Sequence, residues 1–103
     1  MISVSIMWPN GENASFDHDY YLGKHIPMLA KLLGDKLKKI EVDRGMGGRE
    51  PGSPPAYVAI TRLKFDSIED FQTAFGPHAD RVTGDESNFT NIEVQVQISE
   101  IVK

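Results

Sequence analysis

The chain has 103 residues, of which 40% are hydrophobic and 25% are charged, and its formal net charge at pH 7 is −4. This composition predicts one folded domain over residues 1–103, and the excess of acidic side chains disfavours nucleic-acid binding, which needs a cationic surface. The absence of cysteine excludes disulfides, thiolate metal sites and cysteine nucleophiles.

The first expected element is a strand over residues 2–8, because Ile2, Val4, Ile6 and Trp8 alternate with serine and methionine. The same stretch lacks the charged start and long apolar core of a signal peptide. No run of the chain approaches the ~20 apolar residues that cross a bilayer. We therefore expect a soluble, cytoplasmic protein without a membrane partner.

A helix is expected from Asp17, a candidate N-cap, to Gly34, a natural stop. Apolar residues at helical spacing form a broad stripe on this helix, which predicts that it faces a core. The stripe consists of Tyr21, His25, Met28 and Leu32, flanked by Leu22, Ile26, Leu29 and Leu33. Pro27 lies inside the helix, where it is expected to cause a kink or start a new first turn.

Two further strands are expected around a long loop. Residues 38–46 predict a weaker strand carried by Ile40 and Val42. The Gly- and Pro-rich run 45–55 predicts an irregular loop, either a flap over a site or a plain connection. Residues 56–65 predict the clearest strand, with two alternating faces. One face carries Tyr57, Ala59, Thr61, Leu63 and Phe65, and the other carries Val58, Ile60, Arg62 and Lys64.

A second helix is expected to start at residues 66–69, where an aspartate, a serine and a glutamate form a capping signature. Its apolar stripe includes Phe71 and Phe75, and a Gly-Pro pair interrupts it just before His78. Residues 83–90 are polar and predict a loop, and the alternation over residues 92–98 predicts the last strand.

The order β-α-β-β-α-β predicts an α+β fold of the ferredoxin-like kind, a four-stranded antiparallel sheet with two helices on one face. The other face is then bare, although it keeps apolar groups such as Met7, Val58 and Ile60, or their alternates along the strands. A second copy hides such a face most simply, so we predict a homodimer.

His25 is a polar residue on an apolar helix stripe and has two interpretations. It is either a buried neutral imidazole that supports packing, or a general base or polar anchor at the floor of a pocket between helix and sheet. Tyr21 shares its face, either as an orienting hydroxyl or as a boundary residue. His78 is a further candidate from the second helix. The predicted walls of the pocket are Trp8, Met28 and Phe75.

No metal or cofactor is expected. The three histidines, at positions 18, 25 and 78, show no ligand spacing of a helical metal site. The glycine run 45–48 is not followed by the lysine and hydroxyl residue of a phosphate loop. Any catalysis therefore rests on proton transfer, positioning and exclusion of water around a small apolar substrate.

Residues 16–28, which read Phe-Asp-His-Asp-Tyr-Tyr-Leu-Gly-Lys-His-Ile-Pro-Met, resemble the first-helix signature of the EthD family. The second helix with Gly76-Pro77-His78, and the segment Phe89-Thr90-Asn91, are also similar to that family. This resemblance implies a dimeric α+β barrel, in which two ferredoxin-like sheets pack face to face. It also implies that His25 and Tyr21, and less directly His78, belong to the site.

Members of this family accompany a cytochrome P450 system in ether-degradation gene clusters. The resemblance thus implies a pocket for small hydrophobic or aromatic compounds in catabolism. One interpretation is a cofactor-free oxidoreductase or isomerase-like enzyme, with His25 as proton shuttle and Tyr21 as its hydrogen-bonding partner. The alternatives are a non-catalytic ligand-binding or accessory protein for an oxygenase partner, and a structural domain with a vestigial pocket. The sequence contains no nicotinamide or flavin motif that supports a reductase.

Overall fold

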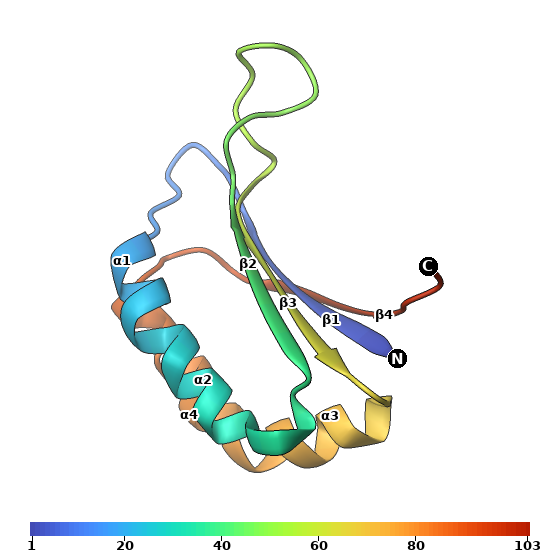
Figure 1. The fold of residues 1–103 in the computed structure, drawn as a ribbon. Helices are drawn as coiled ribbons and strands as arrows, with labels where there is room; N and C mark the ends of the chain where they lie inside the picture. Colours follow the sequence, from blue (N-terminus) through green and yellow to red (C-terminus); the bar gives the residue numbers. More distant parts are fainter.

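A single antiparallel sheet organises the computed structural model, which describes all residues from 1 to 103 (Figure 1). Its strands are β1 (Ile2–Pro9), β2 (Lys39–Arg44), β3 (Tyr57–Phe65) and β4 (Gln95–Glu100). Their spatial order is β2-β3-β1-β4, so the first strand in the sequence lies between β3 and β4. This arrangement confirms the predicted ferredoxin-like α+β fold.

The last strand begins later than the sequence pattern predicts. Gln95, rather than Ile92, is the first residue of β4, and it pairs with Met7 of β1. Beyond Met7 no residue of β1 pairs with β4, and the pairing of β1 with β3 becomes irregular between Trp8 and Pro9. The residues before Gln95 therefore have no regular partner, although their alternation continues.

The first helical segment connects β1 to β2. It consists of α1 (His18–Tyr20), the π-helical turn η1 (Tyr21–His25), α2 (Ile26–Leu33) and the 3₁₀ turn η2 (Gly34–Lys36). The Asp17 carboxylate accepts a hydrogen bond from the Tyr20 N–H, which confirms the predicted N-cap. Pro27 lies in the first turn of α2, where a missing N–H is tolerated, so it starts a new turn rather than ending the helix.

The second helical segment connects β3 to β4. It consists of α3 (Ile68–Phe75), the 3₁₀ turn η3 (Gly76–His78), α4 (Ala79–Gly84) and the 3₁₀ turn η4 (Glu86–Asn88). Ser67 caps α3 by accepting from the Asp70 N–H. The prediction of a loop over residues 83–90 is wrong, because helical turns continue to Asn88. Side-chain hydrogen bonds to the first helical segment hold these polar turns, and no local periodicity reports such contacts.

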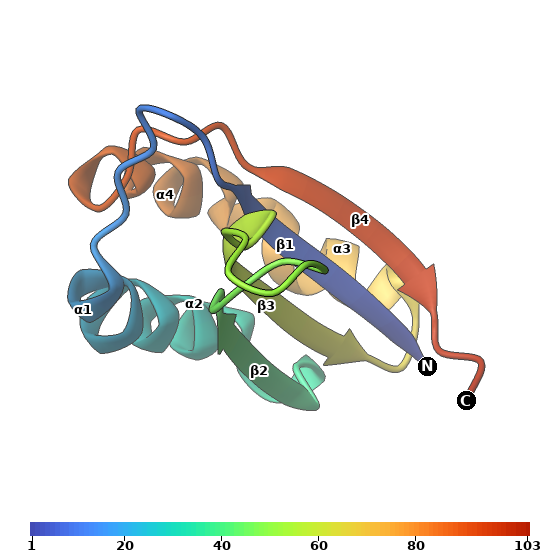
Figure 2. The same cartoon turned by 90° about the horizontal axis from the view of Figure 1, so that it is seen from above.

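Both helical segments cover the same face of the sheet (Figures 1 and 2). Two groups of buried residues fill the space between the layers. The larger group contains Ile2, Val4, Leu29, Leu33, Leu63, Phe65 and Val82. The second group, nearer to α1, contains Trp8, Tyr21, Ala59 and Phe89. The predicted alternation of β1 and β3 thus directs the expected residues to the core. No helix is long and apolar enough to cross a bilayer.

The opposite face of the sheet carries no helix. Ion pairs join neighbouring strands there, between Lys64 and Glu41 at 3.2 Å and between Arg62 and Asp43. The half-buried Val58 and Ile60 lie on the same face of β3 and precede these charged residues along the strand. This open face therefore presents apolar and charged groups together, as the sequence predicts.

The loop between β2 and β3 extends beyond one end of the sheet (Figure 1). Asn10 fastens its base, because its N–H donates to the Ala56 carbonyl and its Nδ2 donates to the Pro55 carbonyl. A Cβ added to Gly45 would lie 2.2 Å from the Tyr57 carbonyl oxygen, which explains a glycine there. None of residues 45–55 lines the main cavity described below.

Two glycines of the first helical segment are expected to respond in opposite directions to replacement by alanine. Gly34 has φ 65° and ψ −148°, a conformation almost confined to glycine, so Gly34→Ala should destabilise by about 1–3 kcal/mol. Gly23 lies inside η1 with open space around its Cα, so Gly23→Ala should stabilise by about 0.5–1 kcal/mol. Urea denaturation measures both, and a stabilised Gly34→Ala protein would contradict the described helix end.

Candidate functional site

A cavity of about 260 Å³ lies between the sheet and the two helical segments. Of its 14 lining residues, 11 are hydrophobic, so its walls are mainly apolar. The other three are His25, Thr83 and Glu86. A mainly apolar cavity with a few polar groups is the usual form of a small-molecule site, and this one is somewhat smaller than the sites that hold drug-sized ligands.

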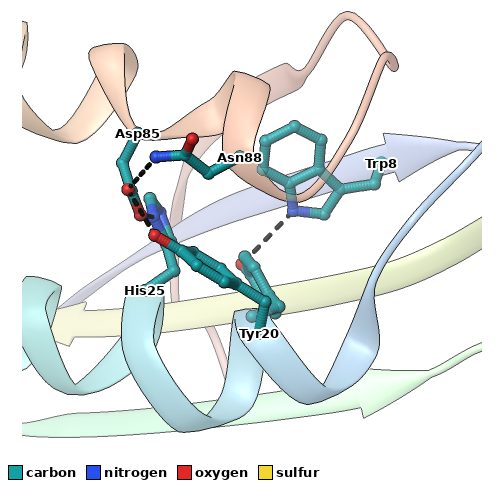
Figure 3. A network of polar contacts seen from close by, with 6 residues as sticks. Trp8, Tyr20, His25, Asp85 and Asn88 are labelled. Atoms are coloured by element: carbon teal, nitrogen blue, oxygen red, sulfur yellow. Dashed lines mark hydrogen bonds and ion pairs between the residues drawn. The ribbon is translucent and has the colours of Figure 1, made fainter.

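The His25 side chain is buried beside this cavity, at the last position of the π-helical turn η1. Its Nδ1 lies 2.9 Å from Oδ2 of Asp85, which follows α4 in the second helical segment. Figure 3 shows this contact together with the other side chains of the network. This contact therefore joins the two helical segments to each other.

Asp85 is the acceptor at the centre of the network (Figure 3). The Tyr20 hydroxyl donates to it at 2.8 Å, and the Asn88 amide donates at 2.9 Å. Burial acts to raise the pKa of Asp85, but the hydrogen bonds from Asn88, His25 and Tyr20 outweigh it and lower that pKa below its usual value. Asp85 is thus a carboxylate at neutral pH.

An ionised Asp85 determines the proton position on His25. A carboxylate only accepts hydrogen bonds, so Nδ1 of His25 carries the proton that is donated to Asp85. Nε2 of His25 then holds the lone pair. It forms no hydrogen bond within the protein, and it is not among the fully buried atoms that lack a partner, so solvent or a ligand can reach it. This is the tautomer that a general base needs, with its basic nitrogen left for a ligand.

Aromatic rings hold the imidazole of His25 in place. The Tyr21 ring is stacked on it, with the centroids 5.4 Å apart and the planes at 16°. The Phe89 ring packs against it in a tilted arrangement, with the ring centroids 4.6 Å apart and the planes at 55°. Packing from these rings and the hydrogen bond to Asp85 together restrict its rotation.

Tyr21 does not form the predicted hydrogen bond with His25. Its hydroxyl reaches β3 instead, lying 2.6 Å from the Thr61 hydroxyl, and it accepts a hydrogen bond from Nε1 of Trp8 at 3.2 Å. Burial raises the pKa of Tyr21, although the hydrogen bonds from Thr61 and Trp8 oppose this change. The ring of Tyr21 lines the cavity, while its hydroxyl ties the first helical segment to the sheet.

The structure brings four of the six predicted site residues to the cavity and separates two. His25, Tyr21, Trp8 and Phe75 line it. Met28 and His78 instead line a shallow groove between α2 and the second helical segment. Leu29, one turn after His25, lines the cavity in place of the expected Met28. His78 belongs to the 3₁₀ turn that follows α3, whose change of helix type moves it off the apolar stripe.

Four polar residues of the site are not indicated by the sequence pattern, namely Thr83, Asp85, Glu86 and Asn88. They lie in the stretch that the sequence pattern predicts to be a loop. Asp85 follows His25 by 60 residues. A run of aspartate, glutamate, serine and asparagine is typical of a solvated turn, so its local signal pointed away from a site. Burial raises the pKa of Glu86. No group of three His, Cys, Asp or Glu side chains is arranged to hold a metal ion.

Comparison with known proteins defines the class to which this fold and site belong. The EthD domain matches residues 10–93, which include both helical segments. The chain therefore belongs to the EthD family, as the first-helix signature predicts. No curated protein matches the chain.

Solved structures agree with this assignment. An EthD-like protein from Ralstonia eutropha JMP134 is 40% identical with a TM-score of 0.94, over 99% of this chain and 92% of that chain. An ethyl tert-butyl ether D (EthD) family protein from Bacillus halodurans C-125 is 19% identical with a TM-score of 0.76, over 99% of both chains. A dimeric protein of ferredoxin-like fold from Bacteroides fragilis is 14% identical with a TM-score of 0.59, over 97% of this chain and 95% of that one. The last two show a shared fold.

Removing the Tyr21 hydroxyl is expected to affect stability directly. Tyr21→Phe leaves the buried Thr61 hydroxyl and Trp8 N–H without their partner, so the free energy of unfolding should fall by about 1–3 kcal/mol. The double variant Tyr21→Phe/Thr61→Val removes one of those stranded groups and should recover part of the loss. Urea denaturation measures both, and a Tyr21→Phe protein as stable as the wild type would contradict this structural role.

Proposed function

We propose that the protein binds a small, mainly apolar molecule in this cavity and that His25 exchanges a proton with it. The observation that carries the proposal is the free Nε2 of His25 beside an apolar cavity, with Nδ1 held by Asp85. Nε2 is not enclosed by the protein, so it is open to a ligand in the cavity. Trp8 and Phe75 form walls of the ligand site, and Tyr21 positions the imidazole.

The roles of the pair follow from its geometry. Nε2 of His25 takes a proton from the ligand, and Asp85 stabilises the imidazolium that results. The apolar walls exclude water, which strengthens this electrostatic effect. Abstraction of a proton from an activated C–H or O–H group begins isomerisations, and it also begins oxidations in which dioxygen accepts the electrons of the resulting anion. We propose that the enzyme acts on small hydrophobic or aromatic compounds by one of these routes, with dioxygen as the co-substrate of the second.

Turnover is expected to depend on both members of the pair. A thermal-shift screen with small neutral aromatic compounds, lactones and alkyl ethers first finds a ligand, because a ligand at 100 times its Kd stabilises by about 2.7 kcal/mol. On a converted ligand, His25→Gln should lower kcat by about 10²–10⁴-fold, and Asp85→Asn should also lower it by favouring the wrong tautomer. His18→Gln, a histidine outside the cavity, is the matched control.

Three outcomes of this experiment are distinct. Conversion at the wild-type rate by His25→Gln would refute the catalytic role of the imidazole. Binding without conversion by the wild type would favour the alternative, a non-catalytic carrier or accessory protein that serves an oxygenase. A His25→Leu protein that is as stable as the wild type, in the absence of any ligand from the screen, would favour a structural domain.

The active form is proposed to be a homodimer that buries the open face of the sheet. Val58 and Ile60 on that face, and the dimeric ferredoxin-like relative in Bacteroides fragilis, support this assembly. Analytical ultracentrifugation at micromolar concentration should give twice the monomer mass of 11.5 kDa. Ile60→Asp should shift the protein toward the monomer, while a wild-type monomer would contradict the proposal.

A further inference from the structure

Glu86 is the one acidic residue that lines the cavity, and no lysine or arginine lines it. Its side chain forms no ion pair and no hydrogen bond within the protein, whereas its backbone carbonyl accepts from Phe89 and Thr90. The mechanism proposed above does not use this group. Glu86 is half-buried, and its oxygens are not among the fully buried atoms that lack a partner, so its carboxyl group is available to a ligand in the cavity.

Glu86 lines the cavity and is half-buried, and this burial raises the pKa of its carboxyl group. After burial itself, the charge of Glu86 adds to the causes that raise the pKa of Tyr21, a residue of the cavity floor. The neighbouring Asp85 carboxylate already accepts three hydrogen bonds within the protein, one of them from His25.

This arrangement has a definite effect on ligands. A hydroxyl or amino group of a ligand would supply the hydrogen bond that Glu86 lacks, and a charged donor would supply a stronger one. A ligand carboxylate would instead meet the like charge of Glu86, with no cation of the cavity lining to compensate. His25 on its own, with an accepting Nε2, also favours a donor on the ligand.

We propose that Glu86 determines the ligand class of this cavity, selecting small apolar molecules that carry a hydroxyl or amino donor and rejecting carboxylates. This inference rests on the proposed small-molecule function and specifies its ligand. The two polar groups then have separate roles. His25 exchanges the proton, and Glu86 accepts the hydrogen bond that orients the ligand. Glu86 is thereby a specificity-determining residue that the sequence pattern did not suggest.

Three probes with the same ring test the proposal, namely 4-methylbenzyl alcohol, 4-methylbenzylamine and 4-methylbenzoate. Their Kd values are measured by NMR titration at pH 7 on the wild type and on Glu86→Gln, which keeps the shape and removes the charge. The wild type should bind the amine and the alcohol about tenfold or more tightly than the carboxylate. Glu86→Gln should lose most of its affinity for the amine and bind the carboxylate better.

A matched variant separates the local effect from the net charge of the protein. Glu50→Gln removes the same charge from the exposed loop between β2 and β3, and it should leave all three affinities within about twofold. The thermal midpoint of Glu86→Gln serves as the folding control. Because burial raises the pKa of Glu86, stability is lost as the pH rises through that pKa, so this variant should be at least as stable as the wild type at pH 7.

The outcomes distinguish this inference from the function on which it rests. Similar affinities of the three probes for the wild type, unchanged in Glu86→Gln, would overturn the role of Glu86 and leave the cavity a ligand site. Binding of other compounds in the thermal-shift screen, with none of the three probes bound, would do the same. Failure of every probe and every screened compound to bind would overturn both proposals.

Discussion

The hydrogen bond between His25 and Asp85 is the interaction on which the candidate site depends. It joins a π-helical turn of the first helical segment to the end of α4, two parts of the chain that are far apart in sequence. Asp85 can play this part because Tyr20 and Asn88 also donate to it and keep it ionised. The same contact fixes the tautomer of His25. One hydrogen bond therefore both joins the two helical segments and leaves Nε2 of His25 as the basic nitrogen.

Two features of the first helical segment place His25 in this contact, namely the π-helical turn η1 and the proline that follows it. Pro27 has no N–H to offer to an α-helical ladder, and the chain meets this constraint by forming η1 before α2 begins. His25 is the last residue of that turn and is buried with its ring against Tyr21 and Phe89. A feature that breaks regular helix geometry thus orients the one imidazole of the cavity.

The cavity combines two kinds of polar group that behave differently. Trp8, Tyr21 and Thr61 satisfy one another and contribute rigidity. The free nitrogen of His25 and the carboxyl group of Glu86 have no such partners and are left for a ligand. Neither group is among the fully buried atoms that lack a partner, so both remain accessible to a ligand.

The sequence by itself determined the order of elements, the caps at Asp17 and Ser67, and the two alternating faces of β1 and β3, but not which of those faces the helices cover. These features depend on local periodicity and on contacts between neighbours, which a single chain displays directly. It also singled out His25, a polar residue on an apolar stripe. Only the tertiary structure decided that Asp85 holds this histidine, that Glu86 lines its cavity, and that Met28 and His78 lie outside it. Those contacts join distant segments, and the polar run that supplies the two carboxylates has no period that would have revealed them.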